Sequence, residues 1–356
     1  MKRTITALLA LPAMLLGVYQ DCEIPAGVID PCEPTCILPS AGPFAICGTN
    51  LFITADFIYW TARLDGLGYA MTGKASQPNV VNAKQGKIFH PEDKFRPGFK
   101  AGIGAKFHCD VWDIYANFTY LQIHNTKSSV SAPSNPSTIL EDLWAIQSPP
   151  VGGQIVLTKA SGKWSLKFNV LDLELGRNFF VSPRLALRPF IGAKGTWQDQ
   201  DYDVVYHGNT LINDGSFRSK ITQDLCFTGG GLRAGVNSSW LLGCNLSLFG
   251  NAAFSTIWGQ FDVVRRQKQK AITPPGSDLL SLDMYNRFHT NKAVLELAAG
   301  IRYDIPLYCK RYNLRFQAGW EQQHWFSQNQ FIRLLEESAH GDLVLHGLTL
   351  EGRFDF

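Results

Sequence analysis

Leu348-Thr349-Leu350-Glu351-Gly352-Arg353-Phe354-Asp355-Phe356 closes the chain, and two kinds of residue alternate strictly along it. Leucine, glycine and phenylalanine take one set of positions, and threonine, glutamate, arginine and aspartate take the other. Side chains of a β-strand point alternately to opposite faces, so one face of this strand is apolar and the other polar. The C-terminus of a soluble domain usually frays. An alternation that runs to a terminal aromatic favours the closing strand of an outer-membrane β-barrel over the edge strand of a soluble sandwich.

The N-terminus indicates export from the cytoplasm. Lys2 and Arg3 precede an apolar run over residues 5–16, which is too short to cross a bilayer as a helix. This layout is typical of a secretory signal peptide. We therefore divide the chain into a signal peptide (1–20), a periplasmic segment rich in Cys and Pro (21–49) and the barrel (50–356).

The composition is compatible with a barrel and gives no support to nucleic-acid binding. Charged residues are 18% of the chain, below the roughly 25% of average globular proteins, and the formal net charge is only +3. The 32 glycines suit the tight turns and curved strands that a barrel needs.

Ten segments alternate with a period of two. In the first, Leu51, Ile53, Ala55, Phe57 and Tyr59 share one face, and no charged residue interrupts the corresponding outer face of the other segments. A charge that faces lipid at mid-membrane costs about 2–4 kcal/mol, which explains why such faces exclude charge. The segments are 51–60, 99–108, 112–120, 164–175, 185–198, 228–236, 245–258, 295–303, 314–321 and 348–356.

The fourth segment changes phase if its apolar residues all face lipid. Trp164, Leu166, Phe168 and Val170 would then point outward, followed by Leu171, Leu173 and Leu175. One extra residue near Val170 and Leu171 would produce this change, so we expect a β-bulge there.

The connections between these segments alternate in length. Short turns are expected near Asp110, Ser182, Ser238 and Pro306, and longer loops over 61–98, 125–162, 199–220, 262–290 and 327–342. Outer-membrane barrels have short periplasmic turns and long external loops. The sequence therefore predicts an all-β, transmembrane antiparallel β-barrel of about 10 strands. A hairpin hidden in 61–98 would make twelve, and the 125–162 loop could hold a short helix.

Aromatic residues gather near the strand ends, as expected for rings at the level of lipid headgroups. Trp112 and Tyr303 lie toward the short turns, and another set lies toward the loops: Tyr120, Trp164, Trp197, Trp258 and Trp320.

The eight cysteines suggest cross-links on the periplasmic side. Only Cys226 lies within a predicted strand. An oxidising compartment favours disulfides, and the spacing matches no common zinc pattern, so we expect no metal. Connectivity cannot be read from sequence. The disulfide candidates are Cys22, Cys32, Cys36, Cys47, Cys109, Cys244 and Cys309.

Several segments resemble one known family. ADFIYWTA (55–62), FNVLDLELGR (168–177), RPFIG (188–192) and RAGVNSSW (233–240) are similar to the major-outer-membrane-protein-like, pore-forming family of chlamydia-related and legionella-type bacteria. The resemblance runs from about residue 50 to the C-terminus. It implies an abundant surface porin in the bacterial outer membrane and, as in chlamydia-type relatives, an envelope cross-linked by cysteines.

We therefore expect a porin that lets small hydrophilic solutes and ions diffuse passively, with no enzymatic activity and no cofactor. A ten-stranded barrel is close to the size that side chains can fill, so the family resemblance rather than physics supports an open pore. A small excess of lumenal positive charge predicts a weak preference for anions. The expected pore-lining residues are Lys100, Lys106, Asp113, Lys167, Asp172, Glu174, Arg188, Lys194, Arg233, Glu296, Arg302, Arg315, Glu321, Glu351 and Arg353.

Two other functions remain as alternatives. A surface adhesin would act through the long loops 61–98 and 125–162 and is compatible with a pore. A barrel-type surface hydrolase would need a catalytic spacing that the loop histidines do not show. The expected partners are outer-membrane lipid, the barrel assembly machinery, which would read Phe356 as an assembly signal, and either a homo-oligomer or disulfide-linked envelope proteins.

Overall fold

A computed structural model of the chain describes residues 50–77, 80–107, 112–134, 138–145, 155–210, 215–243, 245–273, 278–307, 312–333 and 340–356. The signal peptide, the 21–49 segment and all seven disulfide candidates lie outside the described residues, so those expectations stay predictions.

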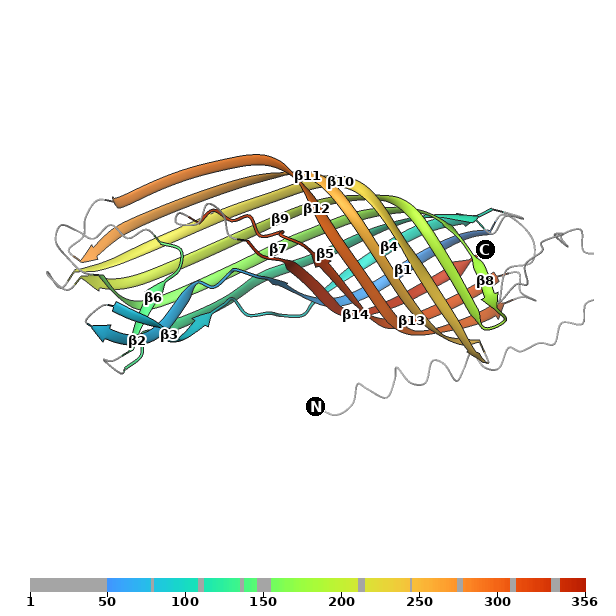
Figure 1. The fold of residues 1–356 in the computed structure, drawn as a ribbon, viewed down its shortest axis with the longest axis horizontal. Helices are drawn as coiled ribbons and strands as arrows, with labels where there is room; N and C mark the ends of the chain where they lie inside the picture. Colours follow the sequence, from blue (N-terminus) through green and yellow to red (C-terminus); the bar gives the residue numbers. More distant parts are fainter. Residues whose placement is uncertain are drawn as a thin grey trace, which may run out of the picture.

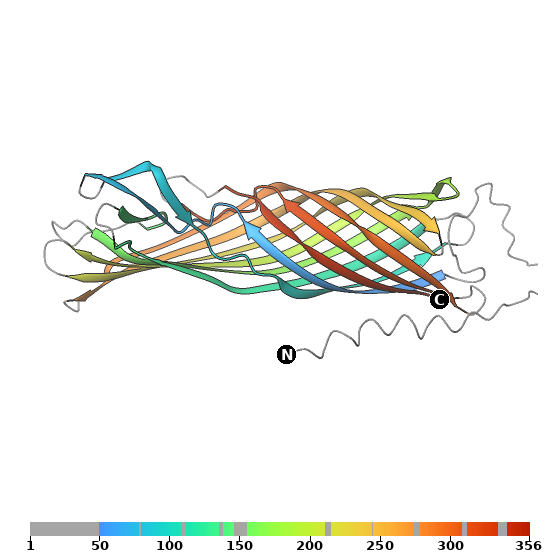
Figure 2. The same cartoon turned by 90° about the horizontal axis from the view of Figure 1, so that it is seen from below.

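Ten antiparallel strands form a closed barrel (Figures 1 and 2). The last strand pairs with the first. Phe356 N donates a hydrogen bond to Leu51 O at 2.9 Å, which extends this ladder to the last residue of the chain. The prediction of about ten strands is therefore confirmed. The barrel strands are β1 (Asn50–Leu64), β4 (Arg96–Lys106), β5 (Trp112–Ser131), β7 (Ile155–Arg177), β9 (Leu185–Thr210), β10 (Ser216–Gly243), β11 (Leu246–Thr273), β12 (Asp278–Leu307), β13 (Tyr312–Trp325) and β14 (Leu343–Asp355).

Four short strands lie outside this cycle. The 61–98 connection does contain a hairpin, β2 (Ala70–Gln77) and β3 (Val80–Phe89), but it pairs with β6 (Thr138–Asp142) in a separate three-stranded sheet. The hairpin therefore adds no strand to the barrel, and β6 forms where a short helix was considered. β8 (Phe179–Ser182) folds back on β9 before the barrel continues. No helix in the described residues is long and apolar enough to cross a membrane.

The strands of one wall are far longer than a bilayer requires. β9 to β12 have 26, 28, 28 and 30 residues, whereas about 9–11 residues cross the hydrocarbon core. They absorb most of the loops expected over 199–220 and 262–290. Figure 1 shows this wall extending well beyond the ends of β1, β13 and β14.

The outward face of the barrel changes character along each strand. On β11, Leu248, Phe254 and Trp258 are exposed and apolar, and the next outward residues are Gln260 and Asp262. The exposed apolar band includes Ile191 on β9 and Leu232 on β10, which are 65% and 72% exposed. We take this band, at the end that carries the short turns, as the part of the barrel that crosses the membrane, and the rest as its outer half.

The inward face shows the reverse change. In the outer half, apolar side chains from all ten barrel strands except β4 fill the interior, among them Trp60, Phe168, Tyr202, Phe261 and Trp325, each 0% exposed. One wall therefore has lipid outside and polar groups inside, and further along it has water outside and an apolar core inside.

This reversal explains why the bulge expected on β7 is absent. The ladder between β7 and β5 runs without a shift from Trp112 to Ile123, so Trp164, Leu166, Phe168 and Val170 point inward. They belong to the outer-half core and do not face lipid. Trp164 consequently does not join the outer aromatic ring.

One short turn lies elsewhere than expected. β10 continues through Ser238 to Gly243, and the turn to β11 includes Asn245. Gly243 (φ 129°) and Asn245 (φ 65°) adopt the left-handed region, which glycine and asparagine tolerate best.

Candidate functional site: the charged lumen and the outer plug

The membrane-spanning part of the barrel encloses a charged lumen. Fourteen of the fifteen predicted pore-lining residues point inward, because alternation places them opposite the lipid-facing side chains. Twelve of them line a cavity of about 280 Å³. Asp172 and Lys194 are buried in ion pairs on the side of this cavity that faces the outer half. The twelve are Lys100, Lys106, Asp113, Glu174, Arg188, Arg233, Glu296, Arg302, Arg315, Glu321, Glu351 and Arg353.

Lys167 is the exception, and its assignment to the lumen is wrong. It is exposed on the outer face of β7, beside Asp199 of β9. The expected bulge would have turned it inward. With unbroken alternation it shares the outward face with Leu171 and Leu173, just beyond the apolar band.

Sequence reasoning missed three inward-facing carboxylates: Asp56, Asp304 and Asp355. Each stands beside an outward-facing aromatic residue, so the two-residue period was the signal that could have found them. The expected excess of positive charge therefore disappears. Nine basic residues inside the described lumen (Lys100, Lys106, Arg184, Arg188, Lys194, Arg233, Arg302, Arg315 and Arg353) face nine acidic ones (Asp56, Asp113, Asp172, Glu174, Glu296, Asp304, Glu321, Glu351 and Asp355).

A network of ion pairs crosses the middle of the lumen. Lys194 Nζ on β9 contacts Asp172 Oδ1 at 2.7 Å and Glu296 Oε1 at 2.5 Å. Arg233 on β10 contacts Glu296 Oε2 at 2.6 Å and also pairs with Glu174. β10 and β12 are separated by β11, so Arg233 reaches past a strand to bind Glu296. The network joins β7, β9, β10 and β12.

Further pairs continue this pattern round the wall. Arg188 on β9 binds Asp113 of β5 and Glu174 of β7, and Lys100 on β4 binds Glu321 of β13 at 2.6 Å. Nearer the short turns, Lys106 and Arg353 share Asp355, each at 2.7 Å, and Arg315 pairs with Asp304 at 2.7 Å. Such buried pairs rarely stabilise a fold more than apolar packing would.

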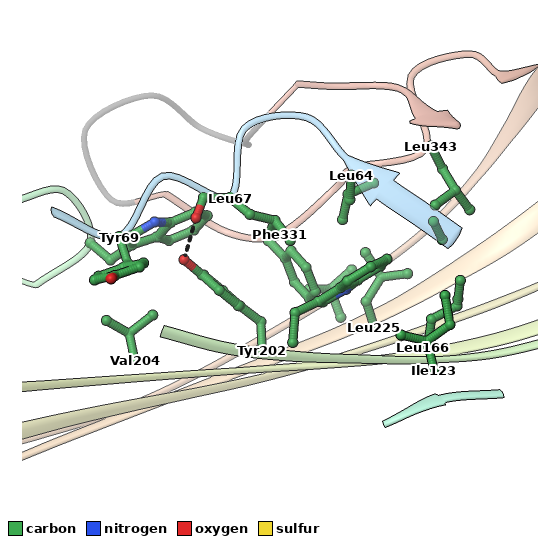
Figure 3. Packing of buried hydrophobic residues seen from close by; sticks show 14 of the residues in the cluster. Leu64, Leu67, Tyr69, Ile123, Leu166, Tyr202, Val204, Leu225, Phe331 and Leu343 are labelled. Carbon is green, nitrogen blue, oxygen red and sulfur yellow. Dashed lines mark hydrogen bonds between the residues drawn. The ribbon is translucent and has the colours of Figure 1, made fainter. Parts of the chain in front are cut away.

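Three inserted segments close the interior of the outer half. They are residues 65–70 after β1, 140–145 at the end of β6 and just beyond it, and 326–333 after β13, and we call them the plug. Tyr202 on β9 donates a hydrogen bond to Leu67 O at 2.8 Å, and its ring stacks on Phe331 with centroids 5.6 Å apart. Figure 3 shows Leu67, Tyr69 and Phe331 lying over Tyr202 and Val204 of the barrel wall.

Polar side chains of the wall hold the 326–333 segment. Gln328 Nε2 donates to Gln198 Oε1 at 3.0 Å, and Ile332 N donates to Gln223 Oε1 at 2.8 Å. All these residues are buried. The segment therefore has defined partners on β9 and β10 and does not merely lie across the barrel mouth.

Arg265 on β11 links two parts of the plug. Its guanidinium donates to Ile332 O at 2.7 Å and to Trp144 O at 2.5 Å, and the residue is 0% exposed. No described carboxylate pairs with it. Burial therefore lowers the pKa of Arg265 to about 10, and two backbone carbonyls are its principal partners.

The described histidines and cysteine give no candidate metal site. Among the described residues no group of three or more His, Cys, Asp or Glu side chains could hold a metal ion. His324 pairs with Asp342 at 2.8 Å beside the plug. Cys226 is a free thiol on the outward face of β10, and burial together with Asp199 raises its pKa to about 11.

Comparison with solved structures finds outer-membrane barrels at very low identity. The outer membrane protease OmpT of Escherichia coli gives a TM-score of 0.37 at 10% identity, covering 87% of this chain and 98% of that chain. A Pseudomonas aeruginosa FadL homologue gives 0.25 at 8% identity, covering 88% and 92%. The P. putida toluene transporter TodX gives 0.26 at 9% identity, covering 87% and 89%. These likenesses say nothing about activity.

No curated protein matches the chain significantly. The family model described as the Legionella pneumophila major outer membrane protein precursor matches residues 47–356, which is nearly all of the chain after the Cys/Pro-rich segment. The chain belongs to this family of bacterial outer-membrane proteins.

Proposed function

We propose that this barrel is a gated porin, through which small hydrophilic solutes and ions diffuse when the plug moves aside. The proposal combines the charged lumen of the membrane-spanning part with the plug of the outer half. In the conformation described here the plug closes the outer end.

The observation that supports the proposal most is the contrast between the two halves. One set of strands is filled with apolar side chains in the outer half and with ion pairs round a cavity in the membrane half. Apolar packing is therefore possible inside a barrel of this size. Buried charged side chains stabilise a barrel interior less well than apolar side chains do, but charged side chains are typical of a path for hydrated solutes.

The near balance of lumenal charge sets the expected selectivity. Nine basic residues face nine acidic ones, most of them in pairs, so little net field favours either sign of ion. We expect weak ion selectivity in place of the anion preference that the sequence indicated.

Single-channel recording in planar bilayers tests the proposal. The refolded wild type should show rare openings, and Glu351→Gln should shift the reversal potential toward anions, because Glu351 lines the cavity. Lys167→Gln removes one charge from the outer face and should leave selectivity unchanged. A folded wild type that never conducts, or equal shifts in both variants, would contradict a current through this lumen.

The same proposal includes a structural role in the envelope. The seven cysteines outside the described residues are candidates for cross-links to neighbouring proteins or to the N-terminal segment. The pairing of Phe356 with Leu51 supports the C-terminal strand as the contact for the barrel assembly machinery. High-mass species on non-reducing gels that collapse with reductant are the expected sign of cross-linking.

A further inference from the structure

A strip of basic side chains crosses the outward face of the barrel's outer half. It runs over five neighbouring strands, from β5 through β7, β9 and β10 to β11, and most of its members are exposed. We call this set the basic strip: Lys127, Lys159, His207, Arg218, Lys220 and Lys268.

Strand register brings these residues directly opposite one another. Lys159 is paired with His207, His207 with Arg218, and Lys220 with Lys268. Lys127 at one end is paired with Lys163. Like charges directly opposite on neighbouring strands, as in Lys220 with Lys268 and Lys127 with Lys163, destabilise a sheet. An anion bound along the strip would relieve this cost.

Few carboxylates of the barrel compensate the strip. Asp203 lies opposite Lys163 and 3.7 Å from Lys220. Among the described residues no ion pair reaches Lys127, Lys159, Arg218 or Lys268. The pKa of His207 is lowered by partial burial and then by Arg218 and Lys159, which shows the positive potential at this position.

The position of the strip favours a partner that stands beside the barrel. His207 lies ten residues beyond Trp197, the last aromatic of the lipid band on β9. At about 3.3 Å per residue on strands tilted by about 40°, the strip is roughly 25 Å above the membrane interface. Its members lie within five residues of the strand ends, at the outer rim of the barrel, and their side chains face sideways into the space beside the wall.

We infer that the basic strip binds phosphorylated sugars of the surrounding lipopolysaccharide, through their phosphate groups. The arrangement of Lys159, Arg218 and Lys268 on three strands suits a polyanion lying across the strand direction. This binding is independent of whether the lumen conducts.

Binding of the full-length, detergent-solubilised barrel to immobilised phosphorylated lipopolysaccharide tests the inference. The strip variant is Lys159→Gln/Arg218→Gln/Lys268→Gln. The matched control is Arg63→Gln/Lys87→Gln/Lys94→Gln, which removes the same charge from exposed sites on β1, on β3 and in the segment before β4. Because the variant loses three cations of the strip, it should bind on the order of tenfold more weakly, and the control should bind like wild type. Binding should also weaken with salt.

Two further binding measurements distinguish the phosphate groups of lipopolysaccharide from other polyanions. Dephosphorylated lipopolysaccharide should bind all three proteins equally weakly, and heparin serves as a soluble polyanion. Equal losses in strip and control variants, an unchanged strip variant, or a loss confined to heparin would each overturn the inference. Heat-modifiable gel migration checks folding, and the three single substitutions, each with a smaller loss, replace the triple variant if it fails to fold.

Discussion

At the scale of single residues, Arg265 is the side chain on which the closed state depends most. It is a fully buried cation whose guanidinium holds Ile332 and Trp144 through their carbonyl oxygens. Removing one partner from a buried hydrogen bond costs about 1–3 kcal/mol, because the other partner is left unsatisfied. The two inserted segments therefore share this residue of β11 as a common partner.

Arg265→Met should loosen the plug without unfolding the barrel. Arg333 is the last residue of the plug segment 326–333. Its side chain donates a hydrogen bond to Gly66 O at 3.0 Å and lies over the Trp144 ring. Loosening should expose it, so trypsin should cleave after Arg333 on the order of tenfold faster than in wild type. Arg266→Met, at the exposed neighbouring position, is the control and should leave the rate unchanged. Equal rates in all three proteins would show that Arg265 does not hold the plug.

Asp342 gives the plug a pH dependence. Ser327 begins the turn in the left-handed region (φ 50°), its N–H donates to Asp342 Oδ1 at 2.7 Å, and His324 also binds this carboxylate. Burial acts to raise the pKa of Asp342, but the hydrogen bonds from His324 and Ser327 outweigh it, and the pKa is lowered overall.

A lowered carboxyl pKa contributes stability above the unfolded value and loses it as the pH falls further. This contribution to closure should therefore be complete above about pH 3.9, the ordinary pKa of an aspartate, and be lost progressively as the pH falls from there through the lowered pKa of Asp342. Asp342→Asn should open more often at neutral pH and lose this acid response. Bilayer current recorded from pH 7 to pH 3 measures both, and an acid response that persists in Asp342→Asn would contradict the assignment.

At the scale of elements, β7 shows what the sequence could and could not predict. The two-residue period correctly separated the faces of most strands, because lipid excludes charge from one side. It failed on β7, where apolar residues were all assigned to lipid. Leu173 does face lipid, but Phe168 faces the outer-half core. A period of two identifies two faces, and only the environment at that height decides which face is apolar.

Substitutions on β7 distinguish the two arrangements. Phe168→Ala should lower the free energy of unfolding by about 3–5 kcal/mol, because it leaves a cavity in the outer core. Lys167→Ala, on the exposed face, should change it by less than about 0.5 kcal/mol. Urea unfolding in lipid vesicles gives both values. A large loss for Lys167→Ala with a small one for Phe168→Ala would restore the bulged arrangement.

At the scale of the whole molecule, the barrel interior has two parts. Ion pairs line a cavity of about 280 Å³ within the membrane, and the plug fills the outer half. The sequence identified most lumenal charges, since each follows from its own strand's alternation. It did not indicate their pairing across three or four strands, such as Arg233 with Glu296, or the return of 326–333 into the barrel. These contacts depend on which strands become neighbours, and no local pattern encodes that.

The measurement that tests the gated porin most directly is the current through a barrel in which most of the plug segment 326–333 is replaced. Residues 328–332, which form the buried contacts with Gln198, Gln223 and Tyr202, are replaced by a Gly/Ser linker of equal length. Refolded protein with heat-modifiable migration is then recorded in planar bilayers beside wild type. A gated porin predicts a mean current at least on the order of tenfold larger, since hydrogen bonds of about 1–3 kcal/mol no longer favour closure. A folded variant that conducts no more than wild type would contradict it.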